Sequence, residues 1–277
     1  MLEKRWVSEL ARELGLNAAA FIVTVYGDVV VPRGGVLWTG TLIDICAQVG
    51  INESLVRTAV SRLVAARRLR GERIGRRSYY RLDAAAQREF DHAAGLLFGP
   101  DRPASGWQIL WAPDLGMEEA ARMRLGHMGG AVFLRPDRGQ ALPEGAMLFH
   151  ATGPEGVPDV ARFWDLSSLQ ARYELLLQRF GPLEAALEGA GLPDAEALGL
   201  RLLLVHAYRA VLLRDPRLPG AVLPAGWQGH AARDLFRRLY RRLTPGSERH
   251  IAARFEGDAG PLPARTPESE QRLACVI

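Results

Sequence analysis

Nine arginines lie close together in one short stretch of the chain and could neutralise a row of phosphates. Between Arg57 and Arg81 they are accompanied by a single acid, Glu72, so nine positive charges minus one give this stretch a formal charge of +8. The whole chain carries only +4, so the other residues sum to −4. Neutralisation of phosphates by arginine supplies most of the non-specific affinity of proteins for nucleic acid. The charge distribution therefore predicts a nucleic-acid contact in this stretch.

The elements that must position these arginines are two short helices and a hairpin. Apolar residues at helical spacing predict a first helix over 39–49. Asn52 can cap a second helix, which ends near Ala66. The pattern then predicts strands over 69–74 and 78–82, separated by a short basic turn. Two helices followed by a basic hairpin are typical of a winged helix-turn-helix, which reads DNA with its second helix.

The second helix divides into an apolar face and a polar face. The inner, apolar face is predicted to hold Leu55, Val56, Ala59, Val60, Leu63 and Val64. Polar side chains on the outer face can reach base edges in a major groove, and those of the hairpin can meet the DNA backbone or minor groove. The predicted DNA-contact residues are Arg33, Asn52, Ser54, Arg57, Thr58, Ser61, Arg62, Arg73, Arg76, Arg77 and Tyr79.

An alternative interpretation is that the helices form a scaffold and the arginines a solvated surface, which is the usual meaning of a basic run. That alternative does not explain why a helix-turn-helix pattern, a hairpin and the charge coincide, so DNA binding is the preferred interpretation. For Thr58 and Ser61 taken singly, an ordinary exposed side chain fits equally well. The Gly-rich turn at 32–35 could present Arg33 to a phosphate or simply join two helices.

Composition limits the class of protein. A chain of 277 residues with 48% hydrophobic content can bury a sizeable core and hold two or three domains. The two cysteines, Cys46 and Cys275, have neither metal-site spacing nor the pattern of a disulfide framework, so we expect a reducing cytoplasm. No stretch has the pattern of a signal peptide or a membrane span, and no motif predicts a bound cofactor.

Linkers and periodicity predict an α+β chain with three domains and a tail. The strand, helix, strand, strand order of the middle part suits a small ferredoxin-like domain that has been shortened. The predicted divisions are a winged helix-turn-helix domain over 1–98, a ferredoxin-like domain over 104–154, an all-α C-terminal domain over 159–255 and a flexible tail over 256–277. The helices predicted in the C-terminal domain cover 163–181, 182–191, 194–214 and 230–243.

Three parts of the chain together resemble a known family. The N-terminal part contains PRGGVLWTGTLI at 32–43 and NESLVRTAVSRLV at 52–64, and the C-terminal part contains VHAYRAVLLRDPRLPGAVLPAGWQGHAARDLFRRLY at 205–240. The middle part is similar to the small ferredoxin-like fold of the Cas2 nucleases. With these partners in this order, the chain resembles the PaaX family of bacterial transcriptional repressors over residues 18–255.

The resemblance implies a homodimer that represses a phenylacetate catabolic operon by binding inverted half-sites in double-stranded DNA. It also implies release by an acyl-CoA inducer, which is phenylacetyl-CoA in the best-known members. An acyl-CoA needs cations for its phosphates and an apolar slot for its acyl group. The candidate effector-binding residues are Trp164, Arg172, Tyr173, His206, Tyr208, Arg209 and Trp227. Taken singly, each is more commonly a structural residue, as an isolated histidine on an apolar helix usually is.

Two other classes of function are alternatives. The similarity to Cas2 suggests a metal-dependent nuclease as the first alternative. Such an enzyme needs a carboxylate at the end of the first strand of that domain to hold the metal ion. Asp114 is the one acid near that place, so we expect no enzyme and no metal site. The second alternative is an architectural DNA-binding protein without a ligand, which would have no need of a large helical C-terminal domain.

Two substitutions test the predicted DNA-contact residues. Arg57→Ala should weaken operator binding by about 1–3 kcal/mol and relax specificity, because Arg57 lies on the helix predicted to read bases. Arg76→Ala should mainly reduce the salt dependence of binding, because Arg76 is predicted to meet a phosphate. Footprinting and salt titrations measure the two effects. A footprint that Arg57→Ala leaves unchanged would contradict the first prediction.

Overall fold

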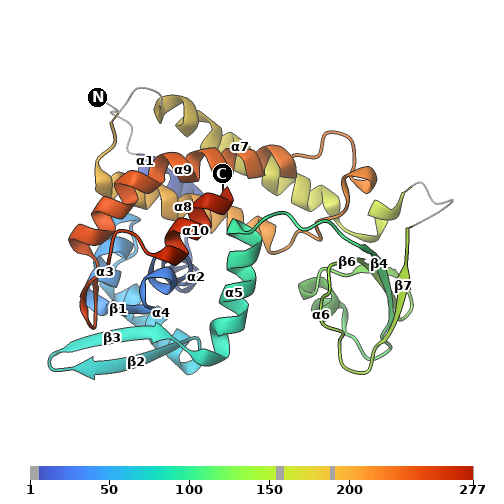
Figure 1. The fold of residues 1–277 in the computed structure, drawn as a ribbon, viewed down its shortest axis with the longest axis horizontal. Helices are drawn as coiled ribbons and strands as arrows, with labels where there is room; N and C mark the ends of the chain where they lie inside the picture. The colour runs from blue at the N-terminus through green and yellow to red at the C-terminus, as the bar shows by residue number, and fades with distance from the viewer. Residues whose placement is uncertain (1–5, 154–158, 188–190, 277) are drawn as a thin grey trace. The chain divides into compact units, whose positions relative to one another are not determined.

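The computed structural model describes residues 6–153, 159–187 and 191–276. It divides into two compact units, each of which is described by itself (Figure 1). The first unit comprises residues 1–100, 176–209 and 232–277. The second unit comprises residues 101–175 and 210–231.

The first unit begins with two helices, α1 (Trp6–Leu14) and α2 (Ala18–Val25). Asn17 starts α2 by accepting a hydrogen bond from the Ala20 amide at 3.1 Å, which satisfies one of the unpaired donors at the helix end. The apolar sequence of α2 buries Phe21 and its neighbours, as its composition predicts. The helix then widens into a π-helical turn, Tyr26–Val30, and a 3₁₀ turn, Val31–Arg33.

Two further helices and a three-stranded sheet complete the N-terminal part of this unit. The predicted helices are confirmed as α3 (Thr39–Gln48) and α4 (Glu53–Ala65), and the predicted hairpin as β2 (Leu69–Ile74) and β3 (Arg77–Leu82). A short strand that the pattern does not predict, β1 (Val36–Trp38), pairs with β3 in the order β1-β3-β2. The hairpin of β2 and β3 extends from this sheet (Figure 1).

The predicted faces of α4 need one correction. Its buried residues are Val56, Ala59, Val60 and Leu63. Leu55 and Val64, which were predicted to face inward, are 51% and 38% exposed. The buried stripe of α4 is narrower than predicted because these two residues lie at its margins.

Helix α5 (Ala84–Phe98) follows β3, and three long helices supply the rest of the core. They are α7 (Leu166–Leu187), α8 (Asp194–Leu212) and α9 (Gly229–Arg254). The helix predicted over 163–181 and the first part of the one predicted over 182–191 form the single helix α7, which contains Pro182; residues 188–190 lie outside the described residues. The last predicted helix, 230–243, continues through Pro245. Near that proline the Thr244 and Ser247 hydroxyls donate to the Tyr240 and Leu243 carbonyls, each at 2.7 Å.

The second unit contains a four-stranded antiparallel sheet. Its strands are β4 (Gly106–Trp111), β5 (Gly126–Gly129), β6 (Val132–Asp137) and β7 (Met147–Ala151), in the order β5-β6-β4-β7. Helix α6 (Met117–Arg122) connects β4 to β5, a strand that the sequence pattern does not predict. Leu110, Ala120 and Phe133 form the core between this helix and the sheet.

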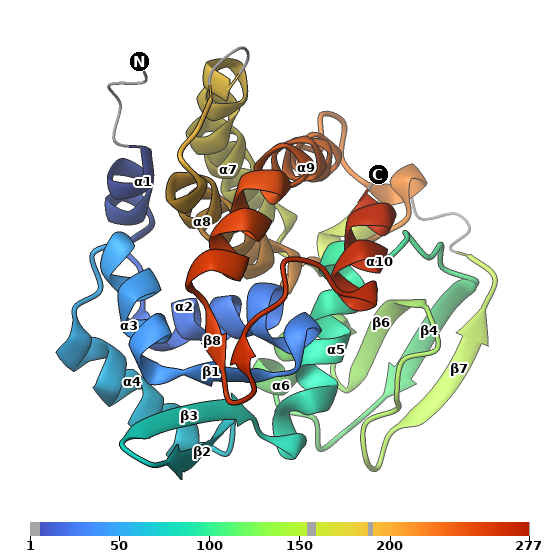
Figure 2. The same ribbon diagram turned by 60° about the vertical axis from the view of Figure 1, so that its left-hand side comes forward.

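The segment 256–277 was predicted to be a flexible tail, and this prediction is corrected. Its residues form a short hairpin, β8 (Glu256–Gly257) and β9 (Gly260–Pro261), and helix α10 (Pro267–Val276). β8 lies beside β1, and α10 packs against α5 (Figure 2). Its proline and polar content suggested disorder, but Leu262 and Val276 are buried in this unit.

The predicted domain boundaries also differ from the observed units. The helices of the predicted C-terminal domain are shared, because α7, α8 and α9 each begin in one unit and end in the other. Residues 210–231 belong with the sheet, whereas most of α8 and α9 belongs with the N-terminal helices. Linker composition marks where the chain turns, but it does not reveal which distant helices share a core.

A buried ion pair lies in the centre of the first unit. Asp28, in the π-helical turn, and Arg201, on α8, are each 2% exposed, and their charged atoms are 3.0 Å apart. The Tyr240 hydroxyl on α9 donates to the other oxygen of Asp28 at 2.9 Å, and the Arg201 guanidinium lies over the Tyr240 ring. Three elements that are far apart in the sequence therefore meet at one buried charge pair.

Asp28→Asn should destabilise the protein by about 3–5 kcal/mol, because it leaves the buried Arg201 charge unbalanced. Urea unfolding followed by circular dichroism measures the change in the free energy of unfolding. Glu184→Gln is the matched control: it removes an exposed pair with Arg238 and should cost less than about 1 kcal/mol. Equal effects of the two substitutions would contradict the assigned role of the buried pair.

Candidate nucleic-acid interface and ligand pocket

The outer face of α4 presents a row of polar side chains to solvent. Ser54, Arg57, Thr58, Ser61 and Arg62 are all exposed, as their spacing predicts. The buried residues of the opposite face hold α4 against the rest of the unit, and α2 packs beside it. This arrangement leaves one face of a rigid helix free to enter a groove of about its own width.

Two of the predicted contact residues at the start of α4 already have intramolecular partners. Asn52 accepts a hydrogen bond from the Leu55 amide at 3.0 Å and so caps the helix. Arg57 forms an ion pair with Glu53 one turn earlier, at 2.6 Å. An exposed pair at this spacing contributes only about 0.3–0.5 kcal/mol, so it does not prevent Arg57 from binding another anion.

The basic hairpin adds further exposed cations. Arg73 donates to the Gly75 carbonyl within the turn, at 3.3 Å, and Arg76 is exposed at its tip. Among the nine arginines of the described stretch 57–81, four make no side-chain hydrogen bond or ion pair: Arg62, Arg67, Arg70 and Arg76. The arrangement can therefore bind several phosphates without first breaking internal contacts.

Two arginines of β3 are bound by acids from the C-terminal hairpin. Arg77 pairs with Glu256 and lies over the Trp38 ring, 4.6 Å from its centroid. Arg81 Nη2 is 3.3 Å from Asp258 Oδ2 and 3.2 Å from Glu72 Oε2. These arginines are about half exposed, so their charges are partly neutralised at the surface.

Two residues predicted to contact DNA are buried instead. Arg33 is 5% exposed, and its guanidinium donates to the carbonyls of Val29, Pro263 and Ala264. Tyr79 is 7% exposed and lies opposite Trp38 in the sheet. Both predictions are corrected, because each side chain packs inside the unit. The Gly-rich turn at 32–35 fits its simpler interpretation, a connection between elements.

The candidate effector residues fall into two groups. In the second unit, the Tyr173 hydroxyl donates to Asp215 at 2.6 Å, and its ring contacts Trp227 edge to face. Trp164 donates to the Arg124 carbonyl at 3.0 Å, and Arg172 is exposed. These contacts hold the unit together, and they bring Tyr173 and Trp227 into one cluster.

In the first unit, the three candidates on α8 occupy different surroundings. His206 Nδ1 is 3.0 Å from the Thr24 hydroxyl, and burial, assisted by the charge of Arg209, lowers the pKa of His206 to about 4. His206 is therefore a neutral core residue near pH 7. Tyr208 is buried and stacks on Phe236, with ring centroids 4.4 Å apart. Only Arg209 lines a pocket.

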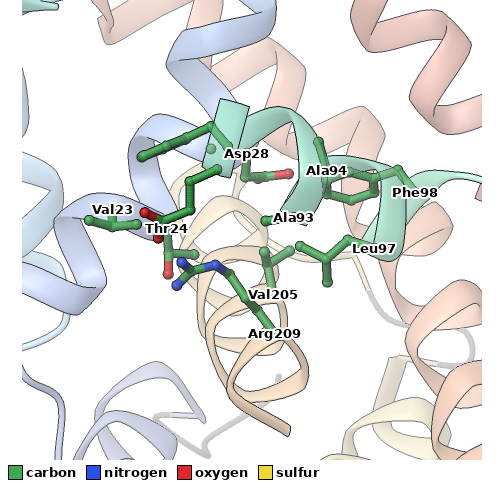
Figure 3. Close-up of a pocket in the computed structure, with 12 residues that line it drawn as sticks. Val23, Thr24, Asp28, Ala93, Ala94, Leu97, Phe98, Val205 and Arg209 are labelled. Atoms are coloured by element: carbon green, nitrogen blue, oxygen red, sulfur yellow. The ribbon is translucent and has the colours of Figure 1, made fainter. Parts of the chain in front are cut away.

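This pocket lies among α2, α5 and α8 (Figure 3). Its empty volume is about 370 Å³, which includes space open to solvent. The wall from α5 is largely apolar and includes Phe90, Leu97 and Phe98. Arg209 is the one cation among the lining residues, and its pKa is lowered chiefly by burial. The cavity volume of the pocket is only about 20 Å³, which is about the room that one water molecule needs, so a larger group could enter only if the helices moved apart.

One acid that the sequence analysis did not single out links this pocket to the hairpin. Glu89, on α5, lines the pocket and forms an ion pair with Arg68, just before β2, at 2.8 Å. Its negative charge also raises the pKa of Arg209, against the larger lowering effect of burial. Only its place among the polar positions of a predicted helix could have suggested it, because its partners are distant in sequence.

The described residues do not provide the carboxylate site that a metal-dependent nuclease would need. Asp114 is exposed after the end of β4. Among the residues that the structure describes, no three or more histidine, cysteine, aspartate or glutamate side chains lie close enough to hold a metal ion. None of the described helices has both the length and the apolar character required to cross a bilayer.

Two family models match the chain. The model described as "PaaX-like protein" matches residues 17–86, and the model described as "PaaX-like protein C-terminal domain" matches residues 164–253. Together they span more than half of the chain. The Transcriptional repressor PaaX of Escherichia coli (strain K12) is 29% identical over an alignment of 286 positions, which covers 94% of this chain and 90% of that protein. A solved structure, the uncharacterised protein Rv0674 from Mycobacterium tuberculosis, aligns at 23% identity with a TM-score of 0.47, covering 75% of this chain and 88% of its own.

The neutral state of His206 makes stability depend on pH. The folded pKa of about 4 lies below the ordinary value of 6.5, so the unfolded chain binds more protons between these pH values. Stability should be fully present above pH 6.5 and should fall by up to about 3 kcal/mol as the pH drops to 4. His206→Gln should flatten this part of the profile, whereas His230→Gln, at an exposed position, should not. Identical profiles for the two variants in urea unfolding would contradict the prediction.

Proposed function

This chain belongs to the PaaX family, and from that premise we propose that it is a transcriptional repressor that binds operator DNA in the bacterial cytoplasm. The observation that carries the proposal is the exposed basic surface formed by the outer face of α4 and the adjoining hairpin. Arg62, Arg67, Arg70 and Arg76 provide unpaired cations there, within the described residues. The named repressor from Escherichia coli aligns with nearly the whole chain, which supports the same function.

We propose that this surface belongs to a winged helix-turn-helix. In that fold the second helix enters the major groove, and its N-terminal residues contact base edges. Here α4 would be the reading helix, with Ser54, Arg57, Thr58 and Ser61 toward the bases. The hairpin of β2 and β3 would be the wing, with Arg73 and Arg76 toward the backbone.

We also propose that the second unit has a ferredoxin-like fold. A helix joins β4 to β5, and β6 lies between these two strands in the sheet. This is the arrangement of a split βαβ motif, and it supports the assignment. The sheet has the order expected of that fold, with a loop in place of the second helix between β6 and β7.

The repressor is proposed to act as a homodimer. A single winged helix reads few base pairs, and a two-fold dimer reads inverted half-sites about 34 Å apart or a multiple of that distance. The sheet of the second unit offers a surface for this contact, since Trp111, Met147 and Phe149 are each about half exposed. The N-terminal helix is less suitable, because Trp6 is 7% exposed in the first unit.

The proposed effector is an acyl-CoA, with phenylacetyl-CoA as the leading candidate and a phenylacetate catabolic operon as the target. The pocket among α2, α5 and α8 offers an apolar slot for the acyl group, and Arg209 can donate to its carbonyl oxygen. Tyr173, Trp227 and Arg172 of the second unit are alternative candidates for an effector site within that unit.

The position of the pocket offers a route to the DNA-contact surface. One wall is α2, which packs against α4, and another is α5, which directly follows the hairpin. A ligand that binds one arrangement of these helices better than another shifts the protein toward that arrangement. An acyl group that separates α5 from α2 would therefore move the hairpin relative to the reading helix.

The test is a gel shift with DNA upstream of this protein's own gene and its neighbours, with and without phenylacetyl-CoA. We expect a shift that the thioester abolishes and that free phenylacetate or free CoA does not. A shift that persists would contradict this inducer and retain the DNA-binding proposal. The absence of a shift on any of this DNA would contradict the repressor proposal.

Ala94→Leu tests the pocket separately. It adds bulk at the α5 wall of the pocket, so DNA binding should persist while release by the acyl-CoA weakens at least tenfold. Ala84→Leu places the same change on an exposed part of α5 and is the matched control. Equal release of both variants would exclude this pocket as the acyl site.

A further inference from the structure

The C-terminal hairpin, residues 255–262, lies against the edge of the three-stranded sheet that carries the basic hairpin (Figure 2). The Leu262 amide donates to the Phe255 carbonyl at 2.8 Å, and both side chains are buried. A Cβ atom at Gly257 would come within 3.2 Å of the Val36 carbonyl oxygen of β1, so the two backbones approach closely. The C-terminal hairpin is therefore a built part of the candidate nucleic-acid interface.

Its two acidic side chains, Glu256 and Asp258, bind the two arginines at the ends of one face of β3. Glu256 pairs with Arg77, and Asp258 shares Arg81 with Glu72 of β2, so the C-terminal hairpin supplies one of the two carboxylates on Arg81. Alternate residues of a strand point to the same face, so Arg77, Tyr79 and Arg81 share a face. The burial of Tyr79 between the two arginines agrees with a covered surface at this place.

We infer that Glu256 and Asp258 occupy on Arg77 and Arg81 the positions that two DNA phosphates would take, so that the C-terminal hairpin competes with DNA. Carboxylates and phosphates accept hydrogen bonds from a guanidinium in the same geometry, and the two anions repel each other at close range. The inference rests on the proposed DNA binding by β2 and β3.

The strength of the pairs permits this exchange. The four side chains are between 34% and 48% exposed, and exposed pairs contribute at most about 1 kcal/mol each. A phosphate can therefore displace either carboxylate. The displaced carboxylates stay close to the DNA, because the Arg33 guanidinium binds the Pro263 and Ala264 carbonyls immediately downstream. The expected result is a permanent reduction of DNA affinity.

A purely structural role predicts the opposite sign. If Glu256 and Asp258 only hold β3 in place, their neutralisation loosens the basic hairpin and weakens DNA binding. If they compete with phosphates, neutralisation strengthens binding and adds two phosphate contacts. The salt dependence separates the two cases, because each neutralised phosphate of duplex DNA contributes about 0.9 to the slope of log K against log salt.

The experiment compares the full-length protein with the variant Glu256→Gln/Asp258→Asn, using fluorescence anisotropy of a labelled duplex between 50 and 200 mM salt. Competition predicts tighter binding at 50 mM and a slope steeper by up to about 1.8, which makes the affinity lost across this range about tenfold larger. The control is Glu268→Gln/Glu270→Gln on α10, which makes the same change in net charge and should leave the slope unchanged. An unchanged or shallower slope in the hairpin variant overturns the inference.

A double-mutant cycle gives an independent measurement. Arg77→Gln should reduce affinity little in the wild-type background, where Glu256 already binds Arg77, and several-fold more in the Glu256→Gln background. Equal losses in the two backgrounds overturn the competition. If the wild-type protein binds DNA but the two losses are equal, the proposed function stands and only the competition is contradicted. If the wild-type protein binds no DNA, both the proposed function and the competition are contradicted.

Discussion

The buried pair of Asp28 and Arg201 constrains the arrangement of the first unit. Neither charge is stable in the protein interior without the other, so the π-helical turn after α2 and helix α8 must meet at one place. Tyr240 adds α9 to the same contact. The N-terminal helices next to the basic surface therefore share one core with α8, which lines the pocket, and with α9. A change in the packing of one of these helices can therefore affect the others through the shared core.

Because these helices share one core, the pocket lies close to the exposed basic surface of α4 and the hairpin. The pocket has α2, α5 and α8 as walls, and α5 begins where β3 ends. Glu89 lies in the pocket lining and also binds Arg68 beside β2. Glu89 is also next in sequence to Phe90 of the apolar wall, and its negative charge raises the pKa of Arg209. Coupling over such a short path needs no large rearrangement, only two packings of α5 against α2 with a small difference in free energy.

Local sequence patterns predict α4 and the hairpin of β2 and β3 to within one residue at each end, because capping, periodicity and turns depend on near neighbours. The same patterns do not predict β1, whose three residues become a strand only by pairing with β3. Arg33 and Tyr79 are on the basic stretch or near it, yet both are buried by partners that no local pattern reveals. The Nε atom of Arg33 donates to the carbonyl of Pro263, which is 230 residues later in the sequence. Composition likewise made the last residues appear disordered, although Leu262 and Val276 are in the core.

The contact between Arg33 and the carbonyls of Pro263 and Ala264 has a consequence for how the protein is made. The guanidinium of Arg33 needs these acceptors to be buried without loss of hydrogen bonds, and β1 needs β8 beside it. During synthesis the N-terminal helices leave the ribosome long before residues 263 and 264 do. The contacts of Arg33 that support the basic surface therefore form only after residues 263 and 264 have been made. A fragment that ends after α5 lacks these contacts, so it would leave the Arg33 guanidinium without two of its three carbonyl acceptors.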